Sequence, residues 1–153
     1  MAIDFVLDED IYHRAMEADC TETAFDLRAA RVVDILQTVH RWVITPDVEV
    51  AYRKRFDEVE CQGAFATIFM TRLNENLATQ ELSILIHDPP VIQGRHSDKD
   101  RHVVDAAAAR DEGCYLITSD DPLRADLAAD GTPERHQFHC CGLRDAEALL
   151  GLR

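Results

Sequence analysis

The stretch SDKDRHVVDAAAARDEGCYLITSDDP, residues 97–122, places carboxylates before an alanine-rich segment and after a short apolar run. Ser97 and Asp100 have the spacing of a capping box, which predicts the start of a helix. Gly113 is a residue at which such a helix can end, and CYLIT (114–118) then predicts a buried strand. The stretch therefore predicts a helix that leads into a strand, with acids at the outer end of each.

Helical and strand-like patterns alternate along the rest of the chain. Thr45 before Pro46 predicts one helix start, because proline suits the first helical position. Strands are expected at 3–7, 42–45 and 136–141, with helices at 11–18, 25–36, 45–59, 65–82, 121–128 and 143–152 and a loop at 87–95. This alternation predicts an α/β fold, a three-layer α/β/α sandwich with a central, mostly parallel sheet. The 153 residues fit a single domain, residues 1–153.

The charge balance is strongly acidic, with 29 Asp and Glu against 16 Lys and Arg and a formal net charge of -13. This charge opposes attraction to nucleic acid or to an anionic membrane, so RNA binding would depend on local basic patches or on a partner. No apolar run approaches the roughly 20 residues of a membrane span. The start MAIDFVLDEDIY carries acids where a secretory signal carries basic residues. We therefore expect a cytoplasmic protein with no membrane segment.

The five cysteines lie at positions 20, 61, 114, 140 and 141. An odd number cannot all pair within one chain, and the adjacent Cys140 and Cys141 are poor partners for each other. The spacing predicts no disulfide framework, which agrees with a reducing cytoplasm.

Acids follow two of the predicted strands. Asp8 comes after FVL, Asp120 comes after YLITS, and Asp100 lies near the start of the helix that feeds the second strand. In a parallel sheet these positions fall at one edge, beyond the carboxyl ends of the strands, where ligands bind. Crowded carboxylates repel one another unless protons or a cation offset their charge, and Mg2+ or Mn2+ suits an all-oxygen shell. Such an ion can activate water and stabilise charge on a phosphodiester.

Three segments together resemble a PIN domain across nearly the whole chain: FVLDEDI (5–11), DKDRHVVDAAAARDEGCYLITSDDPL (98–123), and the late strand that runs into LRDAEALL (143–150). PIN domains are metal-dependent nucleases with a parallel sheet, and many are single-strand endoribonucleases, including VapC-type toxins. The resemblance implies Mg2+ or Mn2+, an RNA substrate, a homodimer and, for a toxin, an antitoxin partner. Residue by residue it places the metal-binding acids at Asp8, Asp100 and Asp120, with Asp121 as an additional candidate.

One position departs from the family pattern. The family commonly has a glutamate just before an aromatic residue in the helix after the second strand, where this chain has Ala51 before Tyr52. Glu49 is the nearest glutamate, and Asp47 lies one helical turn before Ala51. Either acid substitutes, or three acids hold the metal. Glu49 has an equally plain structural explanation as an i,i+4 partner of Arg53.

We therefore expect a divalent-metal-dependent endoribonuclease that hydrolyses single-stranded RNA, with Asp8, Asp100, Asp120 and Glu49 as catalytic candidates. Two alternatives stay open. A degenerate PIN domain would bind RNA or a protein partner without cleaving. A phosphatase of the haloacid dehalogenase kind would use Asp8 as nucleophile and Asp10 as acid, but Lys99 is out of place for that fold's downstream lysine.

Two further groups of residues have simpler explanations. Basic residues that could contact phosphates, but that more often form a solvated face, are Arg41, Arg53–Arg55, Arg72, Arg95, Lys99 and Arg101. HQFHCC (136–141) suggests zinc ligands, yet in a strand His136 and Cys140 face away from His139 and Cys141. We expect these to be strand residues.

Overall fold

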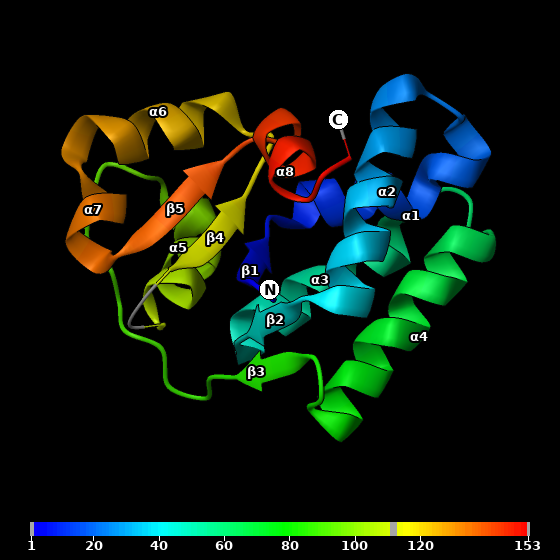
Figure 1. Cartoon of the computed structure of the whole chain (residues 1–153), viewed down its shortest axis with the longest axis horizontal. Helices are drawn as coiled ribbons and strands as arrows, with labels where there is room; N and C mark the ends of the chain where they lie inside the picture. The colour runs from blue at the N-terminus through cyan, green and yellow to red at the C-terminus, as the bar shows by residue number, and fades with distance from the viewer. Residues whose placement is uncertain (1, 111–112, 153) are drawn as a thin grey trace.

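Five parallel strands form the centre of the computed structural model, which describes residues 2–110 and 113–152 (Figure 1). They are β1 (Asp4–Leu7), β2 (Arg41–Ile44), β3 (Ser83–Leu85), β4 (Cys114–Ile117) and β5 (Phe138–Cys141). Their order across the sheet is β3-β2-β1-β4-β5, and every neighbouring pair is parallel. The first strand thus lies at the centre, and the strand order reverses between β1 and β4.

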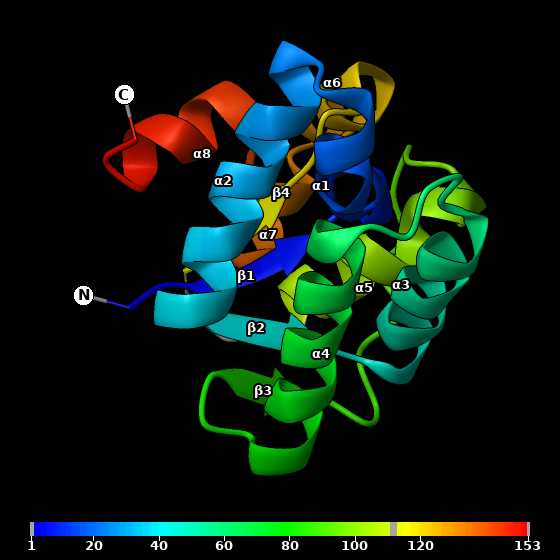
Figure 2. The ribbon, with the colours of Figure 1, turned by 90° about the vertical axis from the view of Figure 1, so that its right-hand side faces the viewer.

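Helices cover both faces of this sheet. They are α1 (Glu9–Thr21), α2 (Ala24–Val39), α3 (Pro46–Glu58), α4 (Ala64–Thr79), α5 (Arg101–Ala108), α6 (Asp121–Asp130), α7 (Thr132–His136) and α8 (Leu143–Leu149). In Figure 2, α2 and α8 lie on one side of the sheet, and α3 and α5 lie on the other. The predicted α/β/α sandwich is confirmed. Among the described residues, no helix is both long enough and apolar enough to cross a membrane.

The central strand β1 shows no alternation of apolar and polar residues along its last three positions. Phe5, Val6 and Leu7 of β1 are fully buried, as expected for a parallel strand covered on both faces. Beside them, the Tyr52 hydroxyl of α3 donates a hydrogen bond to the Leu7 carbonyl at 2.6 Å and accepts one from Trp42 Nε1 at 3.2 Å. These bonds tie α3 to the end of β1.

One predicted helix start is wrong in detail. Residues Asp98–Asp100 form a 3-10 turn and α5 begins at Arg101, because the Ser97 hydroxyl donates to Asp100 Oδ2 at 3.0 Å instead of capping the backbone. Helix α6 begins at Asp121 as predicted, and its cap is Asp120, since the Leu123 amide donates to Asp120 Oδ1 at 2.9 Å. Capping thus accounts for one oxygen of Asp120.

Two short elements were not predicted. The helix expected at 65–82 ends at Thr79, where Gln80 adopts a left-handed φ of 56°, and the chain then enters β3. The strand expected at 136–141 begins only at Phe138, because α7 precedes it. Gly131, with a φ of 70°, and Pro133 together favour this extra turn.

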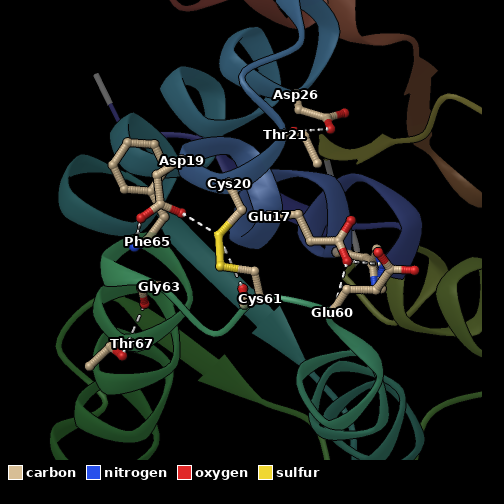
Figure 3. Close-up of a disulfide and its surroundings, with 11 residues drawn as sticks. Glu17, Asp19, Cys20, Thr21, Asp26, Glu60, Cys61, Gly63, Phe65 and Thr67 are labelled. Carbon is tan, nitrogen blue, oxygen red and sulfur yellow. Dashed lines mark hydrogen bonds and ion pairs between the residues drawn. A yellow bond between two sulfur atoms is a disulfide. The ribbon is translucent and has the colours of Figure 1, made fainter.

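The expectation of no disulfide is wrong, because Cys20 and Cys61 are joined (Figure 3). The bond links the end of α1 to the loop before α4, across a sequence separation of 41 residues. Beside it, the Phe65 amide donates to Asp19 Oδ2 at 3.3 Å, so α1 also supplies a cap for α4. A β-carbon at Gly63 would overlap the Asp19 carboxylate, which explains the glycine there.

Candidate active site

The carboxyl ends of β1 and β4 meet where the strand order reverses. Leu7 is paired with Ile117, the Asp8 amide donates to the Ile117 carbonyl at 2.9 Å, and the Thr118 amide donates to the Cys141 carbonyl at 3.0 Å. Asp8 and Thr118 therefore lie side by side, one residue beyond their strands. In open parallel sheets this reversal point is where a crevice forms and ligands bind.

Asp8 is buried, with 4% of its surface exposed, and its Oδ2 accepts a hydrogen bond from the Thr118 hydroxyl at 2.6 Å. Burial raises the pKa of Asp8 to about 7, and the negative charges of Glu9 and Asp10 act in the same direction. The Thr118 hydrogen bond opposes this shift without overcoming it. Negative charge is thus crowded at Asp8 and lacks a compensating cation among these neighbours.

Asp100 and Asp120 belong to the same crowded region. Burial raises the pKa of Asp100, and the charges of Asp120 and Glu9 add to this effect. The Asp120 amide donates to the Thr118 hydroxyl oxygen at 3.0 Å. Because that hydroxyl in turn donates to Asp8, Thr118 connects the acid after β1 to the acid after β4. The structure therefore brings Asp8, Asp100 and Asp120 to one edge of the sheet.

Glu9 and His102 complete this edge, although the sequence patterns did not single them out. His102 Nε2 lies 2.9 Å from Glu9 Oε2. Burial alone would raise the pKa of Glu9, but the hydrogen bond and charge of His102, with a hydrogen bond to Asp8, lower it to about 2. Burial likewise opposes protonation of His102, yet the hydrogen bond and charge of Glu9 raise its pKa. Glu9 is therefore a fixed, ionised carboxylate between Asp8 and Asp100.

The remaining predicted acids are engaged elsewhere. Glu49 Oε2 is 2.8 Å from Arg53 Nε, which is the i,i+4 pair. Burial raises the pKa of Asp105, and the negative charge of exposed Asp47 adds to this shift. Asp121 is 81% exposed and forms an ion pair with Arg124. Glu9, and not Glu49 or Asp47, therefore lies beside Asp8 and Asp100. Its position directly after Asp8 was the available sequence signal.

The basic residues predicted as phosphate contacts are largely ion-paired. Arg53 and Arg55 pair with Glu49 and Asp10, Lys54 lies 3.9 Å from Glu58, Arg41 pairs with Asp4 and Arg72 pairs with Asp34. In HQFHCC, the His139 ring stacks on Tyr115 with 4.7 Å between ring centroids. Cys140 and Cys141 are free thiols within β5. These contacts favour the ion-paired face, and they agree with strand positions for His139, Cys140 and Cys141, whereas His136 ends α7.

The acids fit a divalent cation in their chemistry. Asp8, Asp100 and Asp120 each use one carboxylate oxygen in a hydrogen bond, to Thr118, Ser97 and the Leu123 amide. Their other oxygens are hard donors of the kind that Mg2+ and Mn2+ prefer. In the described ranges, no three His, Cys, Asp or Glu side chains are already grouped as a metal site. The carboxylates thus suit a divalent cation in donor type and in charge. Binding one ion would require the three side chains to move closer together.

Comparison of the chain with protein-family models, with curated proteins and with solved structures gives no match in any of the three.

Proposed function

We propose that the protein is a divalent-metal-dependent endoribonuclease that hydrolyses phosphodiester bonds of single-stranded RNA. The observation that carries this proposal is the crowding of Asp8, Glu9, Asp100 and Asp120 at the reversal point of the sheet, where the pKa of Asp8 is raised to about 7. A bound cation offsets the repulsion between crowded carboxylates, and phosphate esters are common substrates of acidic metal sites. The choice of RNA rests on the resemblance to PIN domains.

In this proposal Asp8, Asp100 and Asp120 would hold Mg2+ or Mn2+ through carboxylate oxygens. The bound ion supplies Lewis acidity toward water and toward the phosphate oxygens. Thr118 orients the carboxylate of Asp8, and His102 keeps Glu9 ionised beside it. Hydrolysis that leaves a 5′-phosphate and a 3′-hydroxyl is what the resemblance implies. The same resemblance implies a homodimer and, for a toxin, inhibition by an antitoxin protein.

The test is cleavage of labelled single-stranded RNA and DNA with Mn2+, Mg2+ or chelator, comparing the wild type with Asp8→Asn and Asp100→Asn. We expect RNA cleavage that is lost in chelator and reduced at least about a hundredfold in both variants, because each removes a charge on which the cation depends. Cleavage that survives in both variants would contradict the proposal.

Glu9→Gln and Glu49→Gln form a matched pair in the same assay. Both replace a glutamate by its neutral isostere, but only Glu9 contacts the site. We expect Glu9→Gln to lose activity and Glu49→Gln to keep it. The reverse result would restore Glu49 as the fourth acid.

A second candidate is a degenerate domain that binds RNA without cleaving. Ala51 at the family glutamate position, and the lack of a preformed metal cluster among the described residues, favour it. Titration calorimetry separates the two functions, because a binding module takes up RNA but no Mn2+. A phosphatase is disfavoured, because the Asp10 carboxylate is engaged in an ion pair with Arg55 at 2.6 Å. A phosphoryl-enzyme trapped at Asp8 would revive it.

A further inference from the structure

A crevice leads away from Asp120 and consists of two adjoining hollows. The first is about 410 Å3 in volume and is bounded by Arg14 and Ser119 beside Asp120. The second is about 320 Å3 and is bounded by Ser119, Arg124 and Arg144. Both hollows have Ser119 in their lining, so they adjoin at that residue, and each has the volume of a small-ligand site. The path begins at the candidate active site.

Arg14 and Phe25 lie at the junction of the hollows. The Arg14 guanidinium carbon is 4.7 Å from the centroid of the Phe25 ring, and Phe25 also lines the second hollow. The Arg14 side chain is 51% exposed, and its contact with Asp26 is long, at 3.4 Å. A guanidinium plane that rests on an aromatic ring and is open to solvent is a suitable surface for stacking a nucleotide base.

Arg124 and Arg144 line the far part of the path. Arg144 is exposed, and within the described chain its side chain forms no ion pair or hydrogen bond. A β-carbon at residue 142 would overlap the Arg124 guanidinium, so Gly142 allows that side chain to lie against the backbone. Gly142 has an ordinary negative φ of −86°, so its backbone conformation alone does not require glycine.

The charges that line the second hollow are largely compensated. Arg28 is paired with Glu147 and Arg124 is paired with Asp121. Arg144 has no ion-pair partner within the described chain, so its charge is available to a phosphate. The first hollow, next to the carboxylates, contains Asp10 and Asp120 together with Arg14.

We propose that single-stranded RNA occupies this crevice, with a phosphate at Arg144 and a base stacked on Arg14. The inference rests on the proposed function, because that function makes RNA the ligand. It assigns the strand a direction in space, from Asp120 across Ser119 toward Gly142. The bond to be cleaved then lies at one end of the bound segment.

The test is fluorescence anisotropy with a labelled oligouridine of about ten nucleotides, in chelator and over a series of NaCl concentrations. We expect Arg144→Ala to weaken binding about threefold to tenfold and to reduce the slope of log affinity against log salt by about 0.7, since one phosphate contact is lost. Arg14→Ala and Arg14→Lys should weaken binding similarly, because lysine keeps the charge but lacks the stacking plane. Exposed Arg31 on α2 supplies the matched control, Arg31→Ala.

The proposal is overturned if the Arg14 and Arg144 variants bind RNA as well as Arg31→Ala does, or if the wild type binds no RNA at low salt. If RNA cleavage depends on metal but the Arg14 and Arg144 variants bind RNA normally, the proposed function stands and only the RNA path is contradicted. RNA binding that depends on Arg14 and Arg144, without any cleavage, would support the path and contradict the proposed nuclease activity. Loss of a co-purifying protein from Arg144→Ala, with unchanged RNA binding, would overturn the path in favour of a protein partner.

Discussion

Asp8 makes the stability of the protein depend on pH in a direction unusual for an aspartate. Its pKa rises from 3.8 to about 7 on folding, so the folded chain binds its proton more tightly than the unfolded chain does. The stabilisation is fully present below about pH 4 and is lost as pH rises through 7, a change of about 4 kcal/mol. Glu9 has the opposite sign, but its window lies between about pH 2 and its ordinary value of 4.5.

We therefore expect the free energy of unfolding in chelator to fall between about pH 5 and pH 8, and Asp8→Asn to remove most of that fall. Urea unfolding at several pH values measures both quantities. Asp121→Asn is the control, because Asp121 is exposed and paired only with Arg124. Millimolar Mg2+ should restore stability at the higher pH in the wild type but not in Asp8→Asn. An equal pH dependence in both chains would contradict the assignment.

At the scale of elements, Tyr52 fixes the distance between α3 and the candidate site, because its hydroxyl bonds the Leu7 carbonyl directly before Asp8. Tyr52→Phe would leave that carbonyl and the Trp42 indole N–H without these buried partners. We expect a loss of about 1–3 kcal/mol in unfolding free energy, measured by chemical denaturation. Tyr115→Phe is a matched control on the half-buried ring that stacks on His139. Equal losses in the two variants would contradict the role of Tyr52.

The bond between Cys20 and Cys61 fastens α1 to the loop before α4 (Figure 3). Closing 41 residues stabilises the fold by about 4 kcal/mol in the chain-entropy model. Reduction, or the double change Cys20→Ser with Cys61→Ser, should lower unfolding free energy by about 2–4 kcal/mol. A thiol count on the denatured, unreduced chain checks the bond itself. Three reactive thiols agree with the structure, whereas five would refute the pairing.

Local patterns predicted the elements well and the contacts between elements poorly. Asp8, Asp100 and Asp120 could be placed together because strand ends in a parallel sheet share an edge. The pair of Glu9 and His102 joins residues 93 apart in sequence, and no periodicity encodes such a contact. The same holds for Cys20 and Cys61, whose pairing depends on how α1 packs against α4. Strand β3 was missed because three residues are too few to establish a pattern.

At the scale of the whole molecule, the net charge of -13 gives opposite salt responses to stability and to RNA binding. Salt screens self-repulsion over a Debye length of about 10 Å at 0.1 M, so thermal stability should rise as NaCl increases from about 20 to 500 mM. RNA affinity should fall over the same range, because counterion release favours binding at low salt. Scanning calorimetry with an uncharged solute as control measures the first effect. A melting temperature that does not change with salt would show that the acids are already locally compensated.

The central position of β1 also affects when the site forms during synthesis. Asp8 leaves the ribosome 110 residues before its partner Thr118. Pairing of distant strands is slow and waits until both are available. Over that interval the nascent chain carries Asp8 beside Glu9 and Asp10 but without Thr118. If the protein is the ribonuclease proposed above, its site does not exist until the residues after β4 have been synthesised.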